Sequence, residues 1–571
     1  MKDVDDLHLT LLTESGIYTT SKSSKGRRGT AAECLYAPVS KEHLPEIIYL
    51  LKNGYHIETK DDDFAQTALM LASKIGEKST VEALLLEDEA SLNSCDMFGW
   101  PVFHRAVANG QGNIARVLLE HGVFIESQDV DGRSAMHLAA FCNKIDMIKL
   151  LLRFGAGVGS RTARGRTPLM FAASCGYWAI VELLLDHAAN PNATDKFGNT
   201  PLHYSIALGV HKIIKLLLKH GAEINKQNNH GLTPLHYAAM KGNAELCQLL
   251  LKNGADVEIR DDEGCTAVHY AASRGNVNIL RVMLIQAKVN VNERNNTGWT
   301  PLFYAATEGK NAAVEFLLKN GADIDATDEN QQTALEVAAD IGHFPIVGLL
   351  LKTGACGSKC LLESAANGND SIVEFLLKKG VNIETRDSEG RTALHIAICN
   401  DQLSIVKRML RNQANIDSLD DQGCSPLHLA VLRKRRAMVT LLVAKGANLY
   451  LTDENGYTMF HHAVDKGDDS MVEFLLEVAG KSFINAKQND GCTALHLAAS
   501  KGFDTVITLL LQNGAKVNAN DDKGWTPLHY ASDNDFDSTC KLLIENGADL
   551  LSKDENGIIP QYQHQTSDYS D

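Results

Sequence analysis

The sequence predicts an all-α fold, a solenoid of stacked helix-turn-helix repeats. Thr200-Pro201-Leu202-His203 recurs 33 residues later as Thr233-Pro234-Leu235-His236, and again as Thr526-Pro527-Leu528-His529. A chain of 571 residues is also too long for one compact core, whereas small repeats bury their apolar faces against their neighbours.

Looser copies of the motif keep the same phase along most of the chain. The intervals are mostly 33 residues, with a few of 32, 34 or 35 and one of 27. The copies begin at residues 67, 101, 134, 167, 200, 233, 266, 300, 333, 360, 392, 425, 458, 493 and 526. A regular period of this length is typical of repeat proteins.

Each copy contains the signals of two helices and a loop. In the copy at 233–266, Thr233 is suited to cap a helix and Pro234 to occupy its first position. Gly242 favours a left-handed turn, and leucines between 246 and 250 form the apolar stripe of a second helix. Residues 254–264 are expected to form an exposed β-turn finger before the next copy.

This 33-residue period, with Thr-Pro-Leu-His followed by an alanine two residues later, resembles the ankyrin-repeat family over roughly residues 33–560. The resemblance implies an ankyrin-repeat solenoid of about 16 helix-turn-helix repeats with β-turn fingers, which binds proteins on its concave surface. It also implies that the motif histidine links neighbouring loops by hydrogen bonds. Ten of the 21 histidines occupy that position: His104, His137, His203, His236, His269, His395, His428, His461, His496 and His529.

The chain is expected to divide into four segments. These are a disordered N-terminal tail (1–32), an N-terminal block of repeats (33–355), a C-terminal block (356–560) and a disordered C-terminal tail (561–571). The boundary at 355 rests on one short finger, because Gly354 and Cys360 are six residues apart whereas Gly254 and Thr266 are twelve apart. Either two semi-independent halves meet here, or a short turn bridges a regular stack.

Several functional classes are disfavoured by composition and motifs. The net charge of −16 disfavours binding to nucleic-acid phosphates. No apolar run approaches 18 residues, and the acidic N-terminus has no signal-peptide pattern, so we expect neither a membrane span nor secretion. No catalytic motif set is present, and we expect no enzyme activity and no cofactor.

We also expect no metal site. The adjacent pair His461-His462 would project its side chains about 100° apart on a helix, and no nearby cysteine completes a ligand set. Cys356 and Cys360 are close in sequence but have no second pair to join them. The scattered cysteines are expected to be reduced thiols of a cytosolic protein.

Variable aromatic and apolar residues are candidates for a protein-binding surface, since such side chains dominate interface hot spots. The candidates are Met97, Phe98, Trp100, Phe141, Tyr177, Phe197, Trp299, Tyr457 and Trp525. Trp178 opens a nearby second helix and is expected to be partly buried. The alternative is that each ring covers a finger or fills a helix junction, because Trp299, Tyr457 and Trp525 share the position of Trp100 before the motif.

A basic run is the second candidate. Arg433, Lys434, Arg435 and Arg436 are consecutive cations on an acidic chain. They are suited to an acidic peptide, a phospholipid headgroup or an import receptor. The alternative is a solvated turn that faces acidic neighbours.

These observations predict a non-catalytic scaffold or adaptor that binds one or more proteins. The alternative is a regulatory or targeting subunit of a phosphatase or ubiquitin ligase complex. We expect a cytoplasmic location with the nucleus as a second one, and a partner could provide peripheral membrane association. The family resemblance also makes the finger asparagines Asn225 and Asn518 candidates for hydroxylation.

Overall fold

The computed structural model describes residues 56, 58, 60, 65–86 and 90–561. Within them, thirty α-helices, α4 to α33, form fifteen consecutive pairs, and isolated backbone bridges such as Gln128 with Ser134 take the place of strands. The predicted all-α repeat fold is therefore confirmed. The predicted tail at 1–32, the predicted tail at 561–571 apart from residue 561, and the early repeat around residues 33–54 lie outside the described residues.

The chain forms two compact units that divide between Gln331 and Gln332. In the N-terminal unit the first helices of the pairs are α4 (Ala68–Ile75), α6 (Val102–Asn109), α8 (Ala135–Phe141), α10 (Pro168–Cys175), α12 (Pro201–Leu208), α14 (Pro234–Lys241), α16 (Ala267–Ser273) and α18 (Pro301–Thr307). The second helices are α5 (Lys78–Leu85), α7 (Gly112–Glu120), α9 (Ile145–Arg153), α11 (Trp178–Asp186), α13 (His211–Lys219), α15 (Ala244–Lys252), α17 (Val277–Arg281) and α19 (Asn311–Lys319). A π-helical turn, Val282–Gln286, continues α17.

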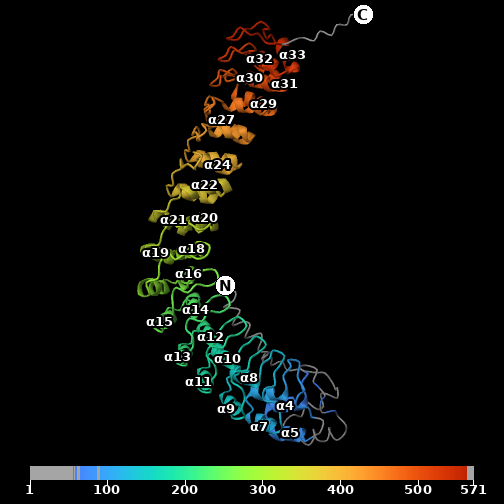
Figure 1. Ribbon diagram of the computed structural model, residues 1–571, viewed down its shortest axis with the longest axis vertical. Helices are drawn as coiled ribbons and strands as arrows, with labels where there is room; N and C mark the ends of the chain where they lie inside the picture. The colour runs from blue at the N-terminus through green and yellow to red at the C-terminus, as the bar shows by residue number, and fades with distance from the viewer. Residues whose placement is uncertain (1–55, 57, 59, 61–64, 87–89, 562–571) are drawn as a thin grey trace. The chain divides into compact units, whose positions relative to one another are not determined.

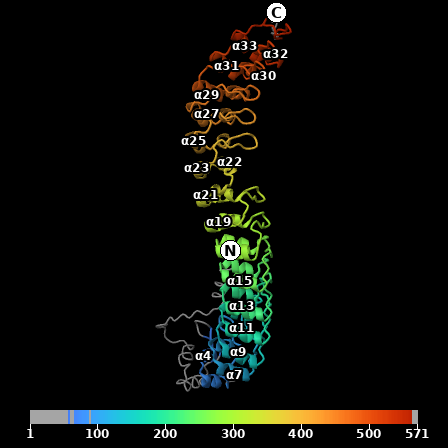
Figure 2. The ribbon, with the colours of Figure 1, turned by 90° about the vertical axis from the view of Figure 1, so that its left-hand side faces the viewer.

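The C-terminal unit repeats the arrangement. Its first helices are α20 (Ala334–Ile341), α22 (Ser358–Asn367), α24 (Ala393–Cys399), α26 (Pro426–Leu432), α28 (Met459–Asp465), α30 (Ala494–Lys501) and α32 (Pro527–Asp533). Its second helices are α21 (Phe344–Thr353), α23 (Asp370–Lys378), α25 (Leu403–Arg411), α27 (Arg436–Ala444), α29 (Asp469–Ala479), α31 (Asp504–Gln512) and α33 (Asp537–Glu545). Figures 1 and 2 show the pairs stacked within each unit, with the fingers projecting beside them.

The core of each unit lies between consecutive pairs. First helices contact first helices, as α12 does with α14, and second helices contact second helices, as α11 does with α13. Ala238 and Ala239 are fully buried, and because alanine is small they let α14 and its neighbours approach closely. Leu250 of α15 is also fully buried. Each repeat thus depends on its neighbours for burial of its apolar faces.

The motif residues close the N-terminus of the first helix. In the repeat at 233, the Thr233 N–H donates to Nδ1 of His236 at 3.1 Å, and the threonine hydroxyl lies 2.8 Å from the same nitrogen. This reciprocal arrangement is a capping box in which histidine replaces the usual glutamate. At Thr333, where the motif histidine is absent, Glu336 takes that role.

The other imidazole nitrogen, Nε2, joins each repeat to the next. His236 Nε2 lies 3.2 Å from the Cys265 carbonyl, 29 residues further on. All ten motif histidines contact a later backbone carbonyl through Nε2, with partners at Arg133, Arg166, Leu232, Cys265, Glu293, Ser418, Tyr457, Ala486, Trp525 and Ile558 in chain order. The predicted linking role of these histidines is confirmed.

Asparagines form a second series of links between fingers. Asn225 Oδ1 accepts the Asp256 N–H at 2.9 Å, and its Nδ2 donates to the Gly254 carbonyl at 3.4 Å. Asn518 makes the same two bonds to Asp549 and Gly547. Both predicted hydroxylation candidates are therefore in use as structural links, and their hydroxylation stays a prediction.

The short finger is closed by a four-residue turn between α21 and α22. Gly357 has no room for a side chain there, because a Cβ would lie 2.7 Å from Val381 and 2.8 Å from Leu351. Helix α22 nonetheless contacts both α20 and α24, so the stack continues through the shortened repeat. This geometry favours the bridging turn, and the division at 355 stays a prediction.

The turn between the two helices of a pair requires a left-handed residue. Gly209 (φ 83°) supplies it in one repeat, whereas Asn143 (58°), Asp401 (62°), Asp535 (58°) and Lys434 (59°) supply it in others. Asparagine and aspartate tolerate this region, and lysine adopts it at a cost of about 1–2 kcal/mol.

We therefore expect Lys434→Gly to raise the free energy of unfolding of the C-terminal unit by about 1 kcal/mol. Gly209→Ala is the matched control, since its Cβ would meet nothing closer than 3.9 Å and the cost is confined to backbone strain. We expect it to lower the stability of its own unit by a similar amount. Thermal and urea unfolding check both, and a destabilised Lys434→Gly would contradict the prediction.

The linking histidines predict a pH dependence of stability. Burial lowers the pKa of His104, His137 and His203 to about 4, and that of His269, His428 and His461 to about 4 as well. An unfolded imidazole has a pKa near 6.5, so between about pH 6.5 and 4 the unfolded chain binds more protons. Stability is therefore complete above pH 6.5 and falls as the pH drops toward 4.

We expect the midpoint of thermal unfolding to fall progressively between pH 7 and pH 5. Carboxylates with a lowered pKa, such as Asp370 and Asp387, affect stability only below about pH 4. They do not account for a loss of stability between pH 7 and pH 5. An NMR titration of the imidazoles gives the independent check. A melting temperature that stays constant or rises on acidification to pH 5 would contradict the assignment.

Candidate functional site

The predicted aromatic surface divides into buried and exposed members. Trp100 is only 3% exposed, and the guanidinium groups of Arg105 and Arg133 lie 4.9 and 5.8 Å from the centre of its ring. Phe98 is half-buried with Arg105 at 5.9 Å from its ring. Trp100 therefore fills a junction between fingers and is not available to a partner.

The other rings at the Trp100 position are also structural. Trp299 stacks on Phe303, and its indole N–H donates to Asp328 at 3.3 Å. The Trp525 indole donates to Asp554 at 3.1 Å in the same way, and both rings are half-buried. Half-buried Tyr457 packs against His461 and His462. These contacts favour the alternative that aromatic residues at this position link successive fingers.

Phe141 and Tyr177 are half-buried as well. Phe141 meets Phe171 edge-on at 6.1 Å, which places it in the contact between α8 and α10. Trp178, at the start of α11, remains 42% exposed, and the Lys212 ammonium lies 2.8 Å from the centre of its ring.

Met97 and Phe197 are the members of the predicted set that face solvent, at 59% and 49% exposed. Val130 occupies the position of Met97 in the next finger and is 75% exposed. We call Met97, Val130 and Phe197 the fingertip set. Sequence reasoning missed Val130, although its place before Asp131-Gly132 marks it as a fingertip.

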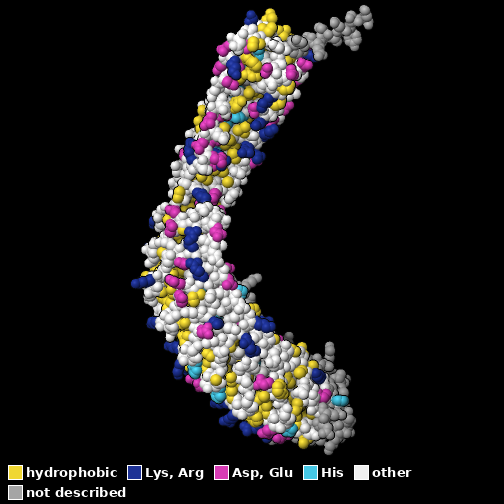
Figure 3. Space-filling model, viewed as in Figure 1, with side chains coloured by type: hydrophobic (Ala, Val, Ile, Leu, Met, Phe, Trp, Pro, Cys, Tyr) yellow, Lys and Arg dark blue, Asp and Glu magenta, His cyan; other side chains and the backbone are white. Residues whose placement is uncertain are grey.

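The N-terminal repeats carry an unusual share of exposed rings. Among the described residues, every phenylalanine or tryptophan classed as exposed lies between 124 and 197, and they are Phe124, Phe154, Trp178 and Phe197. Figure 3 shows apolar side chains among the charged ones over this part of the N-terminal unit. Large apolar groups left in water are typical of binding surfaces.

The basic run forms ion pairs and hydrogen bonds with other residues of the chain. The Lys434 ammonium lies 2.9 Å from Asp468, and Arg435 lies 2.8 Å from Asp401. Arg436 donates to Ser470 and lies over the Phe474 ring at 5.3 Å. These partners come from the preceding and following repeats, so the geometry favours the turn that faces acidic neighbours. A role of Arg433–Arg436 in binding stays a prediction.

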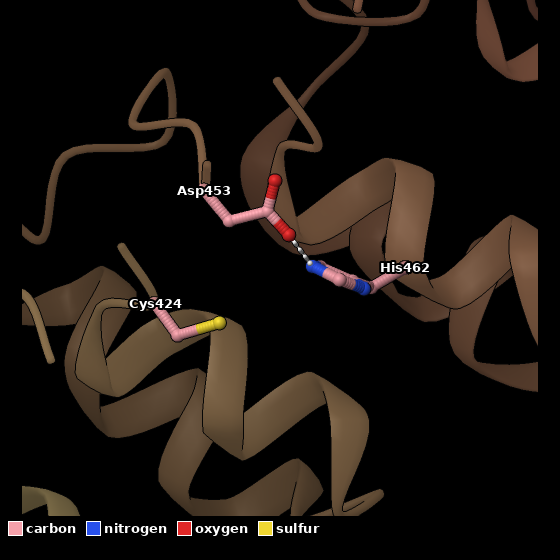
Figure 4. Close-up of side chains that lie close together, drawn as sticks. All are labelled: Cys424, Asp453 and His462. Atoms are coloured by element: carbon pink, nitrogen blue, oxygen red, sulfur yellow. Dashed lines mark hydrogen bonds and ion pairs between the residues drawn. The ribbon is translucent and has the colours of Figure 1, made fainter. Parts of the chain in front are cut away.

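The fold brings together a cluster that the sequence did not predict. Cys424 lies before α26, Asp453 lies in the next finger and His462 lies on α28, and one ligand atom from each falls within 4.8 Å of the other two. His462 Nε2 is 2.9 Å from Asp453 Oδ2, and the dashed line in Figure 4 marks this contact. The expectation that no cysteine lies near His462 is therefore wrong, because Cys424 is distant in sequence but adjacent across the repeat junction.

This cluster lacks the features of a catalytic thiol. Burial is the main cause that raises the pKa of Cys424 to about 12, and the carboxylates of Asp420 and Asp453 add to it. Burial also lowers the pKa of His462. A protonated thiol beside an imidazole that bonds to Asp453 is not an activated nucleophile.

The buried and exposed candidates predict opposite outcomes on substitution. Trp100→Ala should destabilise the N-terminal unit by about 3 kcal/mol, because it leaves a cavity between two fingers. Met97→Ala should change stability by less than about 0.5 kcal/mol, because the side chain is solvent-exposed. Thermal unfolding of the two variants tests this, and equal effects would show that the assignment of buried and exposed roles is wrong.

Comparison with known proteins gives one family. The family model described as ankyrin repeats (3 copies) matches nine stretches between residues 35 and 554, which overlap except at residue 360. No described helix is long and apolar enough to cross a membrane.

Individual relatives match short parts of the chain. A homologue of transient receptor potential cation channel subfamily A member 1 from Caenorhabditis elegans is 40% identical over 114 residues, which is 19% of this chain and 9% of that protein. Potassium channel AKT2/3 from Arabidopsis thaliana is 34% identical over 125 residues, 21% of this chain and 16% of the channel. The putative ankyrin repeat protein YahD from Escherichia coli is 38% identical over 82 residues, 14% of this chain and 41% of YahD. The chain thus spans less than half the length of each.

Proposed function

The chain belongs to the ankyrin-repeat family, and from this premise we propose that it is a non-catalytic scaffold or adaptor that binds partner proteins through its repeat surface. Ankyrin repeats are protein-interaction modules, which supports the general role. The observation that carries the proposal is the set of apolar side chains left exposed on the N-terminal repeats, with Met97, Val130 and Phe197 at fingertips. We place the protein in the cytoplasm, with the nucleus as a second location.

The geometry of the fingertips supports a docking role. Each fingertip is held by an aspartate whose carboxylate accepts backbone N–H groups of the same turn. Asp96 accepts the Phe98 N–H at 2.8 Å, and Asp195 accepts the Phe197 N–H at 2.9 Å. The turns are therefore rigid, and a partner that covers them does not have to order the backbone first. Apolar side chains on a rigid backbone are favourable anchors.

A second candidate is a regulatory or targeting subunit of a phosphatase or ubiquitin ligase complex. It uses the same surface and differs in the identity of the partner, so the identity of the bound protein separates the two proposals. An enzyme subunit among the partners favours the regulatory role. Structural or membrane-associated partners favour the scaffold.

The experiment compares the partners captured by two variants of the full chain, a triple test variant and a double control variant. The test variant carries Met97→Ser, Val130→Ser and Phe197→Ser. The control carries Leu419→Ser and Tyr450→Ser, which remove exposed apolar side chains of the C-terminal unit, at 36% and 58% exposed. Both should melt like the unmodified chain.

We expect the fingertip variant to lose at least one partner by a factor of ten or more while the control retains it. A tenfold loss corresponds to about 1.4 kcal/mol of binding free energy, less than burial of one large side chain supplies. Quantitative mass spectrometry of the captured proteins gives the ratio. Identical partner sets for both variants would place the docking surface elsewhere.

A further inference from the structure

The side chains at three positions of the repeat form a recurring contact between adjacent repeats. They are the residue before the capping threonine or serine, a finger residue of the next repeat, and the residue after the motif histidine position. In one copy, Cys492 Sγ lies 3.3 Å from the Tyr530 hydroxyl, which donates to Asp521 at 2.8 Å.

A second copy has the same geometry with an asparagine. Cys265 Sγ lies 3.1 Å from the Tyr304 hydroxyl, and Asn295 Nδ2 lies 3.2 Å from that hydroxyl and 3.6 Å from the sulfur. In both copies a tyrosine hydroxyl closes the contact by bonding to the thiol.

The copy at Cys424 differs in one residue. His462 replaces the tyrosine and turns Nε2 to Asp453 Oδ2 at 2.9 Å. The buried Cys424 sulfur then forms no hydrogen bond with any described residue, although it lies within 4.8 Å of the other two ligand atoms. Sulfur, nitrogen and oxygen ligand atoms are thus grouped where the copies at Cys265 and Cys492 hold a satisfied hydrogen-bond network.

We propose that Cys424, Asp453 and His462 bind a zinc ion between two adjacent repeats, with water in the fourth position. Cysteine sulfur, histidine nitrogen and carboxylate oxygen are the ligands that zinc uses in tetrahedral sites. Calcium and magnesium prefer oxygen ligands alone, so the thiol disfavours them.

The geometry is within reach of a tetrahedral site. Zinc bonds of about 2.0–2.3 Å place ligand atoms roughly 3.3–3.8 Å apart. The ligand atoms here lie within 4.8 Å of one another, so the sulfur approaches by at most about 1.5 Å, which a χ1 rotation supplies. His462 and Asp453 separate slightly as the ion replaces the hydrogen bond between them.

The surroundings hold the ligands and favour a cation. Asp453 Oδ1 accepts the backbone N–H groups of Asn455 and Tyr457 at 2.9 and 2.8 Å, which fixes the carboxylate and leaves Oδ2 for the metal. Asp420 and Glu454 add negative charge near the sulfur. On binding, the thiol proton leaves to solvent as the Zn–S bond forms, with no change in oxidation state.

The site would act as a link between repeats. Cys424 precedes α26, whereas Asp453 and His462 belong to the repeat of α28. An ion held from both sides stabilises the junction, and the stabilisation grows with the logarithm of its concentration over its dissociation constant. The proposal does not depend on which proteins the chain binds.

Cobalt(II) added to the metal-free full-length chain tests the site, because cobalt replaces zinc in such sites and a bound thiolate gives a charge-transfer band. We expect one equivalent of cobalt with this band, displaced by one equivalent of zinc, and a zinc-dependent rise in melting temperature. His462→Tyr reproduces the residues found at Cys492, Asp521 and Tyr530, so it should fold and lose both signals. Cys424→Ser should lose the band.

Two further variants separate this site from other thiols. Cys356→Ser removes an exposed cysteine and should leave the band unchanged. Tyr530→His, which places histidine beside Cys492 and Asp521, should add a second equivalent of cobalt. A missing band in the unmodified chain, or a band that survives in both His462→Tyr and Cys424→Ser, would overturn the proposal.

Discussion

The bond from a buried imidazole to the backbone of the next repeat is the constraint on which the stack depends. One histidine nitrogen accepts the N–H of the helix cap and the other contacts a carbonyl about one repeat further on, as His203 does at 3.1 Å to Leu232. This requires the neutral Nε2–H tautomer, in which one nitrogen accepts and the other donates. Burial enforces the neutral form, since it lowers the pKa of His203 to about 4. One side chain therefore closes the helix cap and joins it to the finger of the next repeat.

Where this imidazole is absent, the helix cap loses a hydrogen-bond partner, as the repeat at Thr300 shows. Phe303 occupies the histidine position after Thr300, and the Thr300 hydroxyl is buried without a hydrogen-bond partner among the described residues. The next repeat uses Glu336 instead, and the division between the two compact units falls between these two repeats. An unpartnered buried hydroxyl costs about 1–3 kcal/mol, so this repeat is capped less well than those with histidine.

The sequence was sufficient to predict the repeat fold, the helix boundaries near 233–254 and the linking role of the histidines, because these follow from a period repeated in phase. The binding surface was less predictable. The sequence around Trp100 and Trp525 does not show whether their rings are exposed. Only the structure shows that Arg133 and Asp554 of the following finger contact these rings. The Cys424 cluster was missed because Cys424 and His462 are more than one repeat apart in the sequence, and adjacency across a junction is not a local pattern.

The shortened finger before α22 has a consequence for how such a chain changes over generations. The histidine and asparagine links join atoms about 29 and 31 residues apart, as in His236 to Cys265 and Asn225 to Asp256. A large deletion within a repeat removes the backbone that makes these links, and the short repeat before α22 lacks its finger at a place where Gly357 permits the close approach. Duplication of a whole repeat preserves every link. Chain length in this architecture is therefore expected to vary by integral copy number.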